Sequence, residues 1–232
     1  MESRLLRINS RFKQPNETNT QFSVIYNGLN VSSIQLLKFS CMRLFPNIFS
    51  PYDTLIINGQ TLTIPTGQYT ATELAAYITL VGPPCIVNVA NKFEFTSYGT
   101  EIAPTRLSTL VMGFPDIGVL TPSTALDTPT LQGPNPVYIE SSDVAFSNCL
   151  DSEDSNGGTI PLVWSIANDV PHGFQINYEA NDPTISQIDV KAGTLSNRRL
   201  TIRICDQFGH TLVLPHNQFV DIIFKIFYMA NS

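Results

Sequence analysis

The sequence has few charged residues. Asp, Glu, Lys and Arg make up 14% of its 232 residues, against about 25% in an ordinary soluble domain. So little charge favours a protein whose surface is partly covered by another subunit. The net charge of −6 also excludes a nucleic-acid binder whose whole surface is basic.

The sequence also lacks long hydrophobic runs and closely spaced cysteines. The sequence contains no apolar run of about 18 residues, and its start, MESRLLRINSRFK, has no apolar signal-peptide core. We therefore expect neither a membrane span nor secretion by a signal peptide. The cysteines are widely spaced and form no CxxC pair, which argues against a zinc site or a dense disulfide framework: Cys41, Cys85, Cys149 and Cys205. Reduced thiols in a cytoplasmic setting are the expectation.

Catalytic and metal-binding motifs are absent too. The run DSEDSNGG at 151–158 resembles a calcium loop, but Asn156 stands where Gly is needed and Leu162 where Glu is needed. No GxSxG or GxGxxG motif occurs. The histidines form no HxH pair and are expected in turns or on the surface: His172, His210 and His216. We expect no enzymatic activity, no cofactor and no metal site.

A glycine-containing stretch, INGQTLTIPTGQYTATELAAYI, runs from Ile57 to Ile78 and invites comparison with a phosphate-binding loop. A P-loop needs GxxxxGK[ST], and no such Lys follows here. Asn58-Gly59 instead predicts a hairpin turn, because both positions tolerate a positive φ. Thr70 and Glu73 have capping-box spacing and predict the start of a helix that ends at GPP, 82–84. The stretch is interpreted as structural.

Most of the remaining sequence has β-strand alternation. Two strands are predicted between residues 20 and 45, and about six after residue 134. The last, at 219–228, is apolar on both faces and is expected in the middle of a sheet or in an interface. This pattern predicts a mainly β fold, an eight-stranded antiparallel jelly-roll sandwich. A small α+β insertion with a Pro- and Thr-rich return linker would lie between the second and third strands.

The expected domain organisation therefore has four parts. Residues 1–17 form an N-terminal basic arm, 18–46 the first part of the jelly roll, 47–133 the inserted subdomain, and 134–232 the second part of the jelly roll. Residues 1–14 have a net charge of +3, whereas the rest of the chain has −9. The arm could contact nucleic acid or an acidic partner, or it could be solvated or docked on its own domain. Its candidate contact residues are Arg4, Arg7, Arg11 and Lys13.

Several motifs, taken in order, resemble a known family. They are LRINSRF, SIQLLKFSCMRLFPNIFSPY, LTIPTGQYTATELAAYI, PVYIESSDVAFSN and LTIRICDQFGHTLVLPHNQFVDIIFKIFY. Their order resembles that in penton (vertex) capsid proteins of virophages, polinton-like viruses and large nucleocytoplasmic DNA viruses. The resemblance implies a single jelly roll that forms a homopentamer at the icosahedral vertex and contacts the major capsid proteins. It also implies a place in the virion, after synthesis in the host cytoplasm or a viral factory.

The resemblance suggests partners for two segments. The insertion would cap the vertex, hold a fibre or bind a host receptor, and the basic arm would face capsid proteins, an internal membrane or the genome. Two alternatives stay open. One is a trimeric minor capsid or fibre protein, and the other is a carbohydrate-binding β-sandwich, which would need exposed aromatic residues. Trp164, the only tryptophan, lies in an alternating apolar strand and is expected in the core.

Overall fold

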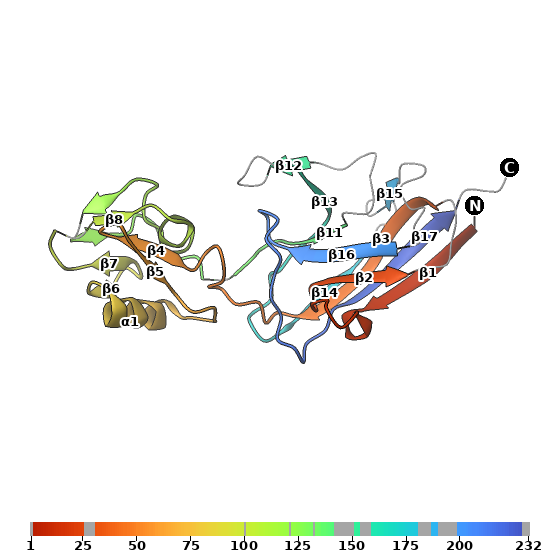
Figure 1. The fold of residues 1–232 in the computed structure, drawn as a ribbon, viewed down its shortest axis with the longest axis horizontal. Coiled ribbons are helices and arrows are strands. Elements are labelled where there is room, and N and C mark those ends of the chain that lie inside the picture. Colours follow the sequence, from red (N-terminus) through yellow and green to blue (C-terminus); the bar gives the residue numbers. More distant parts are fainter. Residues whose placement is uncertain are drawn as a thin grey trace. The chain divides into compact units, whose positions relative to one another are not determined.

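The computed structural model describes residues 2–25, 31–99, 101–120, 122–131, 133–141, 151–153, 159–180, 187–189 and 199–228. The chain divides into two compact units, which we call the sandwich unit (1–45 with 134–232) and the inserted unit (46–133). Both are built mainly from antiparallel strands, as Figure 1 shows. The prediction of a mainly β protein is confirmed.

In the part of the chain that the structure describes, the sandwich unit has two sheets. In the first, β1 (Glu2–Asn9), β17 (Asp221–Tyr228), β3 (Val31–Met42) and β14 (Gln175–Glu179) lie in that order, and β15 (Gln187–Asp189) also pairs with β3. The order in the second is β12 (Asp151–Glu153), β13 (Thr159–Ile166), β11 (Val137–Glu140), β16 (Arg199–Cys205) and β2 (Gln21–Ile25). A short 3₁₀ helix, η1 (Ser10–Phe12), follows β1.

The core of the sandwich unit lies between these sheets. Trp164 of the second sheet and Phe224 of the first are both buried, and their ring centroids are 4.9 Å apart. Trp164 is therefore a core residue, as expected. Strand β17 lies between β1 and β3, which confirms its predicted place in the middle of a sheet. Its residues Ile222, Phe224 and Ile226 alternate with half-buried neighbours, so one face fills the core.

The N-terminal segment differs from the expected arm. Residues 2–9 form β1, which pairs with β17 along its whole length. Three described strands therefore precede the insertion, and its predicted place between the second and third strands is wrong. The cause is the alternation of Leu6 and Ile8 with Leu5 and Arg7: Ile8 is buried, whereas Leu5 and Arg7 are exposed. The arginines obscured this strand pattern in the sequence.

The described residues of the inserted unit form one α-helix and two small sheets. The helix is α1 (Ala71–Val81), and η2 (Leu107–Val111) is a single π-helical turn. One sheet has the order β5 (Gln60–Thr63), β4 (Thr54–Ile57), β8 (Glu101–Ala103), β9 (Val119–Leu120). The other has the order β10 (Ser123–Thr124), β7 (Phe93–Phe95), β6 (Cys85–Val87). The predicted return linker thus contributes a short strand to each sheet.

Local signals in this unit behave as predicted. Asn58 and Gly59 have φ of 50° and 74° at the turn between β4 and β5, as a type I′ hairpin requires. The capping box is complete: the N–H of Glu73 donates to Thr70 Oγ1 at 3.2 Å, and the N–H of Thr70 donates to Glu73 Oε2 at 2.8 Å. Leu74 and Ile78 are fully buried on one face of the helix. Among the described residues, no helix is long and apolar enough to cross a membrane.

Candidate functional site

The four basic residues named from the sequence lie on β1, on η1 and just after it. Arg7 of β1 donates to both carboxylate oxygens of Asp221 on β17, from Nε at 3.2 Å and from Nη2 at 3.0 Å. These hydrogen bonds, together with the charge of Asp221, raise the pKa of Arg7. The pair is exposed to solvent on the arginine side, so it orients Arg7 more than it stabilises the fold.

Two further arginines lie over aromatic rings. The guanidinium carbon of Arg4 is 5.8 Å from the centroid of Tyr228, and that of Arg11 is 5.3 Å from the centroid of Phe219. Both distances are within the range of a cation–π contact. The arginines remain exposed, so each keeps its charge available at the surface. The structure thus fixes three of the four basic side chains on the sandwich unit, which matches the docked interpretation of the segment. That they also contact a partner stays a prediction.

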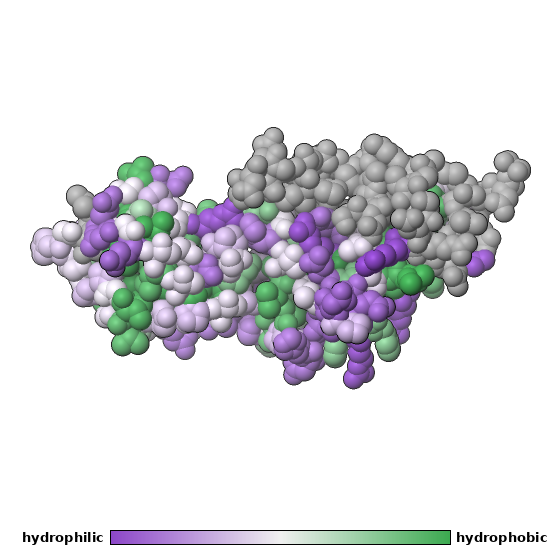
Figure 2. Space-filling model, in the orientation of Figure 1, coloured by the Kyte–Doolittle hydropathy of each residue, from purple (hydrophilic) through white to green (hydrophobic). Residues whose placement is uncertain are grey.

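Large apolar side chains are exposed beside these arginines. Leu5 on β1 is 69% exposed, Phe12 at the end of η1 is 82% exposed, and Ile25 at the end of β2 is 77% exposed. We call β1, η1 and β2 with these side chains the N-terminal flank. Figure 2 shows hydrophobic and hydrophilic surface interspersed in the region of these elements. An exposed set of this kind is typical of a surface that binds a protein.

The backbone of β1 adds a second feature to this flank. The N–H of Ser10 donates to Val220 O at 2.9 Å, and bonded and non-bonded pairs alternate along an antiparallel ladder. The residues that bond to β17 are therefore the even-numbered ones. Ser3, Leu5 and Arg7 direct their N–H and C=O groups away from β17. Among the described strands, none pairs with this outer edge of β1.

Sequence reasoning found the basic residues of the flank and missed its apolar ones. Leu5 and Ile25 look like ordinary strand residues, because alternation alone does not say whether a strand is central or outermost. A usable signal was the Leu5-Leu6 pair, since adjacent residues on a strand face opposite sides and only one can point into the core.

The histidines occupy structural or exposed positions. Asp206 accepts hydrogen bonds from the N–H groups of Phe208 and His210 at 2.9 and 2.8 Å, and its carboxylate is 3.0 Å from His210 Nδ1. These bonds hold the turn of the DQFG motif, where Gly209 has a φ of 77°. His172 and His216 are exposed. Within the described residues, no three His, Cys, Asp or Glu side chains are close enough together to hold a metal ion. Residues 154–158 of the acidic run lie outside the described residues.

Three cysteines are buried free thiols. Burial raises the pKa of Cys41, Cys85 and Cys205 to about 12 in each case. A thiol with this pKa is almost entirely protonated near neutral pH and is a poor nucleophile or metal ligand. Cys205 lies near an ion pair that sequence reasoning missed. There, Arg203 on β16 donates from both Nε and Nη2 to Glu140 on β11, directly across the ladder. Glu140 is buried, so the pair fixes these two strands against each other.

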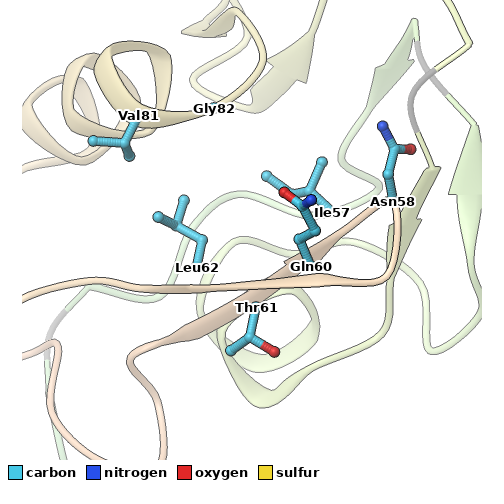
Figure 3. Close-up of a pocket in the computed structure, with 7 residues that line it drawn as sticks. All are labelled: Ile57, Asn58, Gln60, Thr61, Leu62, Val81 and Gly82. Atoms are coloured by element: carbon cyan, nitrogen blue, oxygen red, sulfur yellow. The ribbon is translucent and has the colours of Figure 1, made fainter.

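Gly67 of the glycine-containing stretch has a structural role. Gly67 exchanges backbone hydrogen bonds with Ile48 at 2.9 and 3.1 Å, so its N–H is already used. A hollow of about 300 Å³ lies nearby, between the β4–β5 hairpin and the end of α1 (Figure 3). In Figure 3, Leu62 and Val81 face each other across it, while Thr61 points away. No charged side chain lines this hollow, and a phosphate site needs cationic or free N–H donors.

Comparison with known proteins adds one informative similarity. No family model and no curated protein sequence matches the chain. A crystal structure of the mavirus penton protein matches 97% of this chain and 99% of its own, with a TM-score of 0.51 and 11% sequence identity. The chain shares the fold of a penton protein. At 11% identity this similarity shows the fold alone. As far as the fold is concerned, it confirms the resemblance to penton proteins that was inferred from the motifs.

Proposed function

We propose that this chain is a structural capsid protein, the penton subunit of a virus. Five copies would form a ring at each icosahedral vertex and contact the surrounding major capsid proteins. The observation that carries the proposal is the fold shared with the mavirus penton protein over nearly the full length of both chains, inserted unit included. The place of the protein would then be the virion, and its synthesis that of a viral protein in the host cytoplasm or viral factory.

The strand order supports a jelly roll within this proposal. Among the described strands of the sandwich unit, β1, β2, β3, β11, β13, β14, β16 and β17 have four residues or more. Numbered one to eight along the chain, they lie in the orders 1-8-3-6 and 2-7-4-5. A sheet pair wound as two Greek keys gives this interleaving of early and late strands. The inserted unit then follows the third strand.

Side-chain chemistry supports a structural role. The buried thiols, the turn-forming Asp206 and the core position of Trp164 each have a packing role. The exposed apolar residues of the N-terminal flank, by contrast, have no role in the core of the sandwich unit. We further propose that the inserted unit binds a fibre or receptor, since it exposes Leu80, Val89 and Tyr98.

Electron microscopy of the purified chain tests the proposal. Class averages of negatively stained particles should show rings with five-fold rotational symmetry. Three-fold averages would contradict the penton proposal and favour the trimeric minor capsid or fibre alternative. An affinity tag in a surface loop of the inserted unit should place the protein at the five-fold positions of assembled capsids, and a label spread over the facets would count against it.

A further inference from the structure

Charge is divided unevenly within the sandwich unit. Residues 141–190 contain eight Asp or Glu residues and no Lys or Arg, so this stretch has a formal charge of −8. Residues 1–25 contain four Lys or Arg and two Asp or Glu, a formal charge of +2. The stretch 141–190 therefore accounts for more than the whole net charge of −6. One unit of the chain thus has an acidic segment and a basic segment.

Strands from the two segments are outermost at different ends of the sheets. β1 and β2 are the outermost strands at one end of the two strand orders, and β14 and β12 are outermost at the other. Residues 10–20, which join β1 to β2, bind the connection between their partners β16 and β17: Ser10 bonds to Val220, Thr20 to Leu212 and Asn19 to Pro215. The strands β1, β2, β16 and β17 therefore border one flank. In Figure 1, β14 is drawn fainter than β1 and β2 and so lies farther from the viewer.

The opposite end has its own exposed surface, which we call the β14 flank. It comprises β14 and the residue before it, Phe174, which is exposed. Along β14, Gln175, Asn177 and Glu179 are exposed, while Ile176 between them is buried. Glu179 forms an exposed ion pair with Lys38 at 2.8 Å, and Asp169, a few residues before Phe174, is also exposed. The β14 flank thus combines a large apolar side chain with carboxylates.

The two flanks are complementary in kind. The N-terminal flank presents exposed Leu5, Phe12 and Ile25 among arginines, and the β14 flank presents Phe174 together with Asp169 and Glu179. Arginine and aromatic side chains are enriched in protein interfaces, and opposite charge on two surfaces steers them together. Because the two surfaces belong to one chain but are not the same patch, their contact would be head-to-tail, which is the kind that closes into a ring.

We propose that the N-terminal flank of one copy binds the β14 flank of the next copy. This inference rests on the proposed function, because a ring of five copies needs a contact of this head-to-tail kind. A second copy of the chain fits the N-terminal flank better than nucleic acid or a membrane does. The chain itself supplies the acidic counterpart, and the flank places large apolar side chains between its arginines.

The test uses one full-length variant for each flank. The double substitution Leu5→Glu and Ile25→Glu replaces two exposed apolar side chains of the N-terminal flank with carboxylates. Folding should survive because Leu5 and Ile25 pair with Lys225 and Arg199 across their ladders. The double substitution Phe174→Lys and Glu179→Lys replaces an apolar and an acidic side chain of the β14 flank with cations. Ile117→Glu, at a similarly exposed apolar residue of the inserted unit, is the matched control. A wild-type far-UV circular dichroism spectrum and a cooperative thermal transition show that each variant folds, since loss of assembly alone lowers the melting temperature.

Native mass spectrometry gives the expected pattern. Each flank variant alone should be monomeric, because its altered flank faces the unaltered flank of an identical copy. A mixture of the two should form a dimer of about 51 kDa, twice 25.7 kDa, because one intact pair of flanks remains. The Ile117→Glu control should keep the wild-type mass. Restored pairing in the mixture is specific to a contact between two different surfaces.

Other results overturn the proposal in distinguishable ways. Flank variants that keep the wild-type mass would show that other surfaces join the copies, and the proposed function would stand. A mixture that stays monomeric would exclude the head-to-tail pairing. If the Leu5→Glu and Ile25→Glu variant keeps its mass but loses binding to DNA or anionic vesicles, the flank serves that partner instead. A wild-type chain that is monomeric at all concentrations would overturn both this contact and the proposed ring.

Discussion

The buried cysteines of the core lead to a prediction about thiol reactivity. Cys41, Cys85 and Cys205 are buried, and burial raises the pKa of each thiol to about 12. At pH 8 only about one such thiol in 10⁴ is ionised, so the native protein should leave these three unlabelled by a thiol reagent. In denaturant they should react at once. Rapid labelling of any of the three in the native state, read by peptide mass, would contradict the burial described here.

Trp164 provides a spectroscopic probe of the packing between the two sheets. Its ring lies 4.9 Å from that of Phe224 at an interplanar angle of 43°, and Phe224 is fully buried. Phe224→Ala should therefore lower the free energy of unfolding by about 3–5 kcal/mol and shift the tryptophan emission. Phe227→Ala, on the same strand but half-buried, should cost roughly 1–2 kcal/mol. Equal losses for the two variants in urea unfolding would show that Phe224 is not a core residue.

At the scale of elements, the start of α1 depends on its capping box. Thr70→Ala removes the acceptor for the N–H of Glu73 and should cost about 1 kcal/mol of stability. Thr72→Ala, at an exposed residue in the same first turn of the helix, should be neutral or slightly stabilising. Urea unfolding of both variants gives the comparison. A loss of similar size in both would contradict the cap.

The same cap makes a prediction about pH. Hydrogen bonds from the N–H and hydroxyl groups of Thr70 lower the pKa of Glu73 below its ordinary value of 4.5. Because the folded pKa is lowered, the contribution of Glu73 is fully present above pH 4.5 and is lost as the pH falls through the folded pKa. The stability difference between the wild type and Glu73→Gln should therefore shrink as the pH falls below 4. A difference that stays constant from pH 7 to pH 3 would exclude this contribution.

A truncation distinguishes a paired strand β1 from a free N-terminal arm. Deleting residues 1–9 removes the partner of β17 along eight paired positions and exposes an edge of the sheet. We expect a fall in the melting temperature of roughly 5 °C or more, since each kcal/mol corresponds to about 2–4 °C in a chain of this size. The truncated chain should also aggregate more readily. An unchanged melting temperature would mean that the segment is an arm after all.

Local rules of the sequence predicted the elements whose signals involve neighbouring residues. Asn58-Gly59 and the Thr70–Glu73 box were recognisable because turns and caps depend on contacts a few residues apart. The core face of β17 was also recognisable, because its apolar residues alternate without interruption. The place of β1 was not, since its partner β17 is more than 200 residues away and arginines interrupt its apolar pattern. The Glu140–Arg203 pair and the exposure of Leu5 depend on the same long-range register.

At the scale of the whole molecule, the low charge and the exposed apolar residues have one common explanation. A protein whose surface is partly covered by other subunits needs less charge on the covered surfaces. Composition could predict that such surfaces exist. It could not predict which flanks they are, because a flank is made by strands from both ends of the chain and becomes visible only with the sheet order.

We propose that copies of this chain assemble into a closed ring of five. The native mass of the purified wild-type chain, by mass spectrometry or light scattering, tests this assembly. One chain weighs 25.7 kDa, so we expect a species of about 128 kDa, five times that mass. A species of about 77 kDa, three times the chain mass, would contradict the penton account and support a trimeric capsid or fibre protein.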